Sequence, residues 1–297
     1  MLWVFFALLA HVCWGMVNVT DKYILEKHIR NPYVYIVWLS LLGIFGAIIL
    51  FPFIDFSFPS FQYTLLLFAA SICYFFGGFP YIKAMSMEEA SRINIWWGLI
   101  PIFSLFFSFI FVGQRFSQNE YIGFVFLMLG AVFASVHLKK SAVSFSRAVW
   151  YMALAGVSFA LYAVIFDYVT RRVPFTIAYI LVTIFSFCFA FSTLSFPKFR
   201  QQFFDHLYAL KRKPRYVIVI NSFFEQLGIF FNQWAIFLGV AALVFAMEGF
   251  QFLFVFGLTS GFSLFFPSII KEQINFGNVV MKILALLSMV FGILFVV

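Results

Sequence analysis

Charged residues are scarce in this chain. They make up 10% of its 297 residues, whereas an ordinary soluble domain carries about 25%. A surface this poor in charge cannot be solvated by water, which excludes a soluble globular domain. Disordered and fibrous proteins are excluded as well, because 64% of the residues are hydrophobic. The composition therefore predicts an all-α, polytopic membrane protein.

Cysteines and histidines are too few and too scattered for a disulfide framework or a metal centre. Cys13, Cys73 and Cys188 all fall inside apolar segments and lack metal-ligand spacing. The four histidines are dispersed, and no HExxH, GxSxG, P-loop or GxGxxG motif occurs. We therefore expect no metal, no cofactor and no enzyme. Because an intramembrane enzyme needs only a few dispersed groups, a membrane-embedded enzyme or lipid-handling protein stays open as the alternative.

Long apolar runs, separated by charged or turn-forming residues, fill almost the whole sequence. A spanning helix needs about 20 apolar residues, so the chain has room for roughly ten of them with short loops. The runs predict helices at 1–20, 33–52, 61–82, 92–112, 120–138, 147–167, 175–196, 216–238, 242–266 and 278–297. The stretch 197–215 is expected to be the longest and most basic loop.

The net charge of +8 is explained by its distribution. Fifteen Lys and Arg residues fall in the loops after the odd-numbered segments, and the opposite side holds Arg115, Arg171 and Arg172. By the positive-inside rule the basic loops are cytoplasmic. We expect a multi-pass protein of the plasma (bacterial inner) membrane with both termini extracytoplasmic. The expected partners are the lipid bilayer and a small-molecule substrate, not nucleic acid.

The two halves of the chain are weakly alike. The matching positions are Ala84 with Ala235, Ala90 with Ala241, Gly98 with Gly249, Asp21 with Asp167, and the pair Gly123 and Gly130 with the pair Ala285 and Gly292. Five spans per repeat force the second copy to enter the membrane from the opposite face. The layout therefore predicts two inverted five-helix repeats, residues 1–138 and 139–297, as in secondary transporters.

Short motifs in a particular order link the chain to a known family. They are Trp14-Gly15 and residues 84–92, 101–103, 113–115 and 121–123 in the first half, then residues 248–251, 267–272 and Gly292. With them the chain resembles the ten-helix EamA-type branch of the drug/metabolite transporter superfamily over nearly its whole length. The resemblance implies a central cavity formed by helices 1, 3, 4, 6, 8 and 9. The chain departs from the family at Gln114, where an acidic residue is usual, and at Phe252, where proline is usual.

Two glutamates lie within the apolar segments, where an ionisable group is a functional candidate by default. Glu225 belongs to a stripe on one face of the eighth segment, formed by Asn221, Glu225, Gly228, Asn232, Ala235 and Gly239. Glu248 shares a face of the ninth segment with Gln251. A carboxyl group removed from water can take up a proton at working pH, so both are proton-coupling candidates. The alternative is a packing stripe in which the glutamate satisfies a neighbouring helix.

Aromatic and amide side chains on the surrounding segments are the expected substrate contacts. They are Trp14, Asn18, Tyr74, Asn94, Trp97, Asn232 and Gln251. His11 shares a face with Trp14, and because histidine titrates near neutral pH it is a third proton-coupling candidate. A lone histidine in a span is more often a hydrogen-bonded structural group.

Gly98, Pro101 and Gly249 are the expected hinges. Paired Gly or Pro interruptions at corresponding places in two halves mark the substrate site of transporters, and close packing of small residues is the alternative. The resulting hypothesis is an exporter of small metabolites, amino acids or drug-like organic compounds that works by alternating access, with proton coupling. Monomer and homodimer both stay open, as does a non-transporting scaffold.

Overall fold

Helices make up all the regular secondary structure that the computed structural model describes, over residues 2–29, 31–87, 93, 96–135, 147–210, 212–265 and 276–296. They are α1 (Leu2–Lys27), α2 (Pro32–Leu50), α3 (Phe61–Met87), α5 (Leu99–Phe107), α6 (Gln118–Ser135), α7 (Ala148–Thr170), α8 (Phe175–Thr193), α9 (Pro197–Ala209), α10 (Arg212–Leu238), α11 (Ala241–Ala246), α12 (Gly249–Phe265) and α13 (Phe276–Val296). A 3₁₀ turn, η1 (Phe51–Phe53), follows α2, and a π-helical turn, η2 (Ser108–Val112), follows α5. The predicted all-α class is confirmed.

Each expected segment contains helix, but several local expectations were wrong. The stretch 197–215 holds α9, which begins with Pro197 at a position where proline favours a helix start. The segment 242–266 is not one continuous helix, because it breaks at Met247 and Glu248. At the break, the Glu248 N–H donates to the Phe245 carbonyl and the Gln251 N–H to the Glu248 carbonyl. These bonds span three residues instead of four, which tightens the backbone into a turn.

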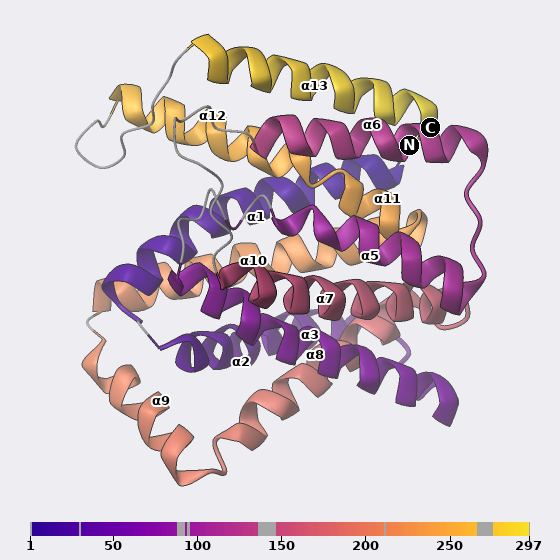
Figure 1. Cartoon of the computed structure of the whole chain (residues 1–297). Coiled ribbons are helices and arrows are strands. Elements are labelled where there is room, and N and C mark those ends of the chain that lie inside the picture. The colour runs from indigo at the N-terminus through magenta and orange to yellow at the C-terminus, as the bar shows by residue number, and fades with distance from the viewer. Residues whose placement is uncertain are drawn as a thin grey trace.

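Six helical stretches of the described residues are long and apolar enough to cross a membrane, judged by length and composition. They are Leu2–Leu25, Pro32–Phe53, Phe61–Met87, Ala148–Thr170, Phe175–Thr193 and Val279–Val296. Three further apolar stretches are shorter, namely Leu99–Val112, Gln118–Phe133 and Ala241–Val255. The start of α1 and the end of α13 lie at the same end of the bundle (Figure 1). The count of ten crossings stays a prediction.

The helices of the two halves pack against each other, and their contacts form matching pairs (Figure 1). α1 packs along α10, and α7 packs along α3; α5 contacts α7, and α12 contacts α1. α2 packs against α8 and α6 against α13. If α1, α2, α3, α5 and α6 correspond to α7, α8, α10, α12 and α13, each of these contacts has its counterpart under exchange of the halves.

The contact between α6 and α13 is close enough to require glycine. A Cβ atom added to Gly292 would lie 2.9 Å from the Gly123 carbonyl oxygen and 3.0 Å from the Leu127 nitrogen. A Cβ atom added to Gly130 would lie 3.1 Å from the Ala285 carbonyl oxygen. Because residue 123 faces 292 and residue 130 faces 285, the two helices run antiparallel with their backbones almost in contact.

We expect Gly292→Ala to lower the free energy of unfolding by about 1–3 kcal/mol, the usual cost of overpacking a close contact. Thermal unfolding of the purified protein in detergent measures the effect. Gly257→Ala in α12 is the matched control, since a Cβ atom there meets nothing within 4 Å among the described residues. Equal melting temperatures for the two variants would contradict the close approach of α6 and α13.

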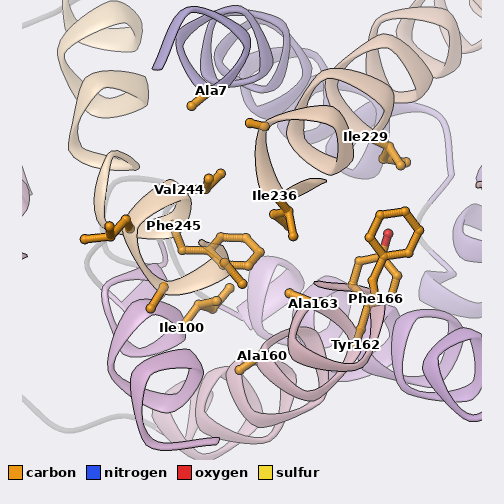
Figure 2. Close-up of a cluster of buried hydrophobic side chains, with 14 of the residues drawn as sticks. Ala7, Ile100, Ala160, Tyr162, Ala163, Phe166, Ile229, Ile236, Val244 and Phe245 are labelled. Atoms are coloured by element: carbon orange, nitrogen blue, oxygen red, sulfur yellow. The ribbon is translucent and has the colours of Figure 1, made fainter. Parts of the chain in front are cut away.

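Buried apolar residues form two clusters, each with members from both halves of the chain. The first contains Ala7 of α1, Ile100 of α5, Ala160, Ala163 and Phe166 of α7, Ile236 of α10, and Val244 and Phe245 of α11 (Figure 2). The second contains Ile24, Tyr35, Ile82, Met85 and Ile218. Along α1, Trp14 and Asn18 lie between Ala7 of the first cluster and Ile24 of the second. A binding site is therefore expected among the residues between the two clusters.

Candidate functional site

A cavity of about 150 Å³ lies between the two apolar clusters. Its walls come from α1, α2 and α3 of the first half and from α7, α8, α10 and α12 of the second, together with Trp97, Ile100, Phe245 and Glu248. An apolar cavity of about this volume holds benzene. The space therefore suits a small organic molecule held by both halves of the chain.

Eight residues that were singled out in the sequence line this cavity. They are Trp14, Asn18, Tyr74, Trp97, Glu225, Asn232, Glu248 and Gln251. Segments far apart in the chain thus bring the predicted substrate contacts and both glutamates to one place. Their roles stay predictions. Asn94 lies outside the described residues.

Glu248 reaches the cavity because the helix breaks beside it. Its side chain is 6% exposed, and its Oε2 atom has no hydrogen-bond partner among the residues that the structure describes. Gln251 lies one turn further on, at the start of α12, and its Oε1 atom also lacks a partner. A buried carboxylate without a partner is strongly disfavoured, so it takes up either a proton or a cation.

Asp21 is a third carboxyl group in the cavity wall. From the sequence it was recognised as the repeat partner of Asp167 but not predicted as a site residue. It accepts hydrogen bonds from the Tyr35 hydroxyl and, at 2.8 Å, from the Asn221 amide, which also donates to the Tyr35 hydroxyl at 3.0 Å. The three residues join α1, α2 and α10. Asp21 follows Asn18 by three residues and Trp14 by seven, and this helical spacing could have indicated that it belongs to the site. The expected helix end at residue 20 placed it outside the segment, whereas α1 continues to Lys27.

Aromatic rings form much of the remaining wall. The Tyr81 ring centroid is 4.8 Å from that of Trp97, and the Tyr74 centroid is 5.1 Å from that of Tyr162. The Tyr81 hydroxyl donates to Asn18 Oδ1 at 3.1 Å, and the Gln233 amide donates to the Tyr162 hydroxyl. These hydrogen bonds fix the rings, so the cavity has a defined shape.

Residues 1–136 match the EamA-like transporter family. The predicted resemblance to this family is thereby confirmed for residues 1–136, and together with the long apolar helices it indicates a multi-pass membrane protein. The EamA-like family consists of transporters, which indicates transport of a small molecule.

The whole chain also shares its fold with solved structures. One crystal structure, described only as that of a protein, has a TM-score of 0.69, and the match covers 99% of this chain and 96% of that one. The identity is 14%, so this likeness concerns the fold alone. A comparison with curated proteins gives no match.

His11 of the EamA-like region lies beside the cavity and not in its wall. It is buried, its Nε2 atom is 3.4 Å from the Val244 carbonyl oxygen, and its ring centroid is 5.9 Å from that of Trp14. The contact with the α11 backbone is the kind that a structural histidine makes. A role of His11 in proton coupling stays a prediction.

The three expected hinge residues lie at the helix breaks beside the cavity. Gly98 is the turn residue before α5, and Pro101 is buried in the first turn of that helix, where proline is tolerated. Gly249 begins α12, directly after the other break. A Cβ atom added to Gly249 would lie 2.9 Å from Ala131 Cα, so close packing alone requires glycine there. Hinge motion at these positions stays a prediction.

Gly228 leaves room for the Trp14 indole in the cavity wall, because a Cβ atom at position 228 would lie 2.6 Å from the Trp14 Nε1 atom. We expect Gly228→Ala to displace the Trp14 indole and to raise the half-saturating concentration of a transported compound about tenfold, equivalent to about 1.4 kcal/mol. Concentration-dependent flux in proteoliposomes measures this. Gly257→Ala, which meets no neighbour among the described residues, is the control. An unchanged half-saturating concentration in Gly228→Ala would exclude Trp14 as a substrate contact.

Proposed function

We propose that the protein is a secondary transporter that moves small metabolites, amino acids or drug-like organic compounds across the plasma membrane by alternating access, in exchange for protons. The observation that carries the proposal is the cavity shared by the two halves. Its wall combines carboxyl, amide and aromatic groups. Trp14, Asn18, Asp21 and Tyr74 fall within the residues that match the family, whereas Glu225, Asn232, Glu248 and Gln251 lie in the second half, which the fold likeness covers.

The exchanged helix contacts support a mechanism of alternating access. Residues 1–138 and 139–297 are proposed as inverted repeats, and the match to the EamA-like family over residues 1–136 agrees with a first unit of that length. Under such symmetry the two ends of the cavity are equivalent. Rocking of one repeat against the other would loosen one apolar cluster while the other stays closed.

Proton exchange is assigned to the glutamates of the cavity. Glu225 lies on α10 and Glu248 at the break before α12, and both line the space where the substrate would bind. A carboxyl group in this position can either hold a proton or compensate the positive charge of a bound substrate, but it cannot do both at once. This competition couples the two movements.

The charge distribution supports the proposed orientation. Lys27 at the end of α1, Lys83 near the end of α3 and Arg212 at the start of α10 all lie toward the ends of helices that were assigned to the cytoplasm. Both termini are then extracytoplasmic. We propose export as the direction of transport.

Proton movement in proteoliposomes that contain a trapped pH dye tests the function. A panel of amines, amino acids, organic acids and neutral compounds is added outside under an imposed proton gradient. We expect at least one compound to accelerate proton movement relative to protein-free liposomes. If the folded protein moves neither protons nor any labelled compound, secondary transport is excluded.

A further inference from the structure

The polar atoms of the cavity define a more specific ligand. We propose that the cavity binds a small protonated amine, whose ammonium group donates hydrogen bonds to Glu248, Gln251 and Asn232. The claim that this amine is also transported rests on the proposed function, whereas its binding does not.

Unpartnered acceptor atoms carry the inference. Glu248 Oε2, Gln251 Oε1, Asn232 Oδ1 and Gln233 Oε1 all belong to cavity-lining residues, and none has a partner within hydrogen-bond geometry among the described residues, with His11 lying beside Gln251. Each of the four side chains is more than nine-tenths buried. Leaving buried acceptors unsatisfied is costly, so the ligand that fits must supply donors. A primary ammonium group supplies three N–H donors on one atom.

The acidic residues of the cavity wall also favour a positively charged ligand. Asp21, Glu225 and Glu248 line the cavity, and no lysine, arginine or histidine is among the lining residues in the part of the chain that the structure describes. Asp21 is already bonded by Tyr35 and Asn221. The acidic groups left for a ligand are therefore the two glutamates, and a cation is what they would hold.

The aromatic wall suits the rest of such a ligand. The faces of Trp97, Tyr81 and Tyr74 offer contact to a hydrocarbon body and attraction to its charge. The Nε1 atoms of Trp14 and Trp97 have no partner, so they can also donate to an oxygen atom on that body. The volume of about 150 Å³ suits a ligand of on the order of 6–10 non-hydrogen atoms, given that benzene binds a cavity of this size.

Two isomeric cations separate an ammonium site from a general cation site. Benzylammonium and 1-ethylpyridinium have the same formula, the same charge and one six-membered aromatic ring, but only benzylammonium carries N–H donors. Isothermal titration of the purified full-length protein in detergent at neutral pH measures both. We expect benzylammonium to bind at least tenfold more tightly. Equal affinities of the two cations, or tighter binding of 1-ethylpyridinium, would overturn the inference. Tighter binding of benzyl alcohol, titrated as the neutral analogue, would overturn it as well.

Matched glutamine variants place the ammonium group within the cavity. We expect Glu248→Gln to weaken benzylammonium binding at least tenfold and Glu120→Gln to leave it unchanged. Glu120 caps α6 outside the cavity, where its Oε2 atom accepts from the Ser117 N–H at 2.7 Å, and glutamine also serves in such a cap. Unchanged binding in a folded Glu248→Gln variant would contradict the assignment. The comparison of the two cations on the wild-type protein decides the ligand class even if this variant fails to fold.

Flux measurements separate the failure of this inference from failure of the proposed function. Binding of benzylammonium without flux of any compound supports the amine site and excludes transport. Proton-coupled flux of compounds that lack an ammonium group, without any binding of benzylammonium, overturns the amine site and leaves the transporter.

Discussion

Glu225→Gln is expected to reduce substrate-dependent proton movement to the level of protein-free liposomes while the protein stays folded. Glutamine has nearly the shape of glutamic acid and keeps polar atoms in the cavity, but it cannot take up and release the coupled proton. The pH-dye assay in proteoliposomes compares this variant with the wild type. Thermal unfolding of both proteins in detergent checks that the fold is retained.

The glutamate at position 120 again provides the control. Glu120→Gln removes a carboxylate of the same type from outside the cavity, and its proton movement should equal that of the wild type. Undiminished proton movement in Glu225→Gln would reject Glu225 as the coupling group. Coupling would then fall to Glu248 or Asp21, the other carboxyl groups in the wall.

The second large effect is expected at the hydrogen-bonded group that joins α1, α2 and α10. Asn221→Leu removes the amide that donates to both Asp21 and Tyr35. The buried carboxyl group then loses one of its two partners, while an apolar side chain takes the place of the amide. We expect the free energy of unfolding to fall by about 2–5 kcal/mol, the range for breaking a buried charged interaction. Thermal and denaturant unfolding in detergent measure the loss.

The adjacent residue supplies a control with the same burial. Ser222 is buried, but its hydroxyl donates at 2.8 Å to Ile218 of its own helix, a bond that adds little to stability. Ser222→Ala should therefore change the stability by less than about 1 kcal/mol. If both variants are equally stable, the group around Asp21 does not tie the three helices together.

The positions of the helices could be predicted because apolar runs of spanning length are the strongest signal in this sequence. Their ends and breaks could not, because they depend on local bonding. The tight turn at Met247 and Glu248 interrupts a run that is apolar on both sides. The end of α1 lies beyond Asp21 because tertiary hydrogen bonds make this carboxyl group acceptable within a helix. α9 forms in a basic stretch that has too few apolar residues to be recognised as a span.

The cavity was predictable where polar residues form a stripe, as on α10 around Glu225 and Asn232. α2 and α8 also line it, through Ser40, Thr183 and Ser186, and neither helix was expected to. Single serine and threonine residues in a span give little indication of a site, because their hydroxyl groups can donate hydrogen bonds to backbone carbonyls of their own helix. Thr183 does so, donating to the Tyr179 carbonyl at 2.9 Å. Only the packing of α2 against α8 shows that these hydroxyls face a shared space.

Access to Ser186 from the two sides of the membrane tests alternating access most directly. Ser186 is a buried, cavity-lining residue of α8 whose Oγ atom has no partner, so Ser186→Cys is a mild change. It is introduced after Cys13, Cys73 and Cys188 have been replaced by alanine. Ser104→Cys is the control, because Ser104 is buried but does not line the cavity.

The measurement is labelling by a membrane-impermeant thiol reagent, applied to right-side-out and inside-out vesicles with and without a transported compound. We predict that Ser186→Cys is labelled from either side, that the compound changes the two rates in opposite directions, and that Ser104→Cys is labelled from neither. Labelling of Ser186→Cys from one side only under every condition, or from neither side, would contradict alternating access through this cavity.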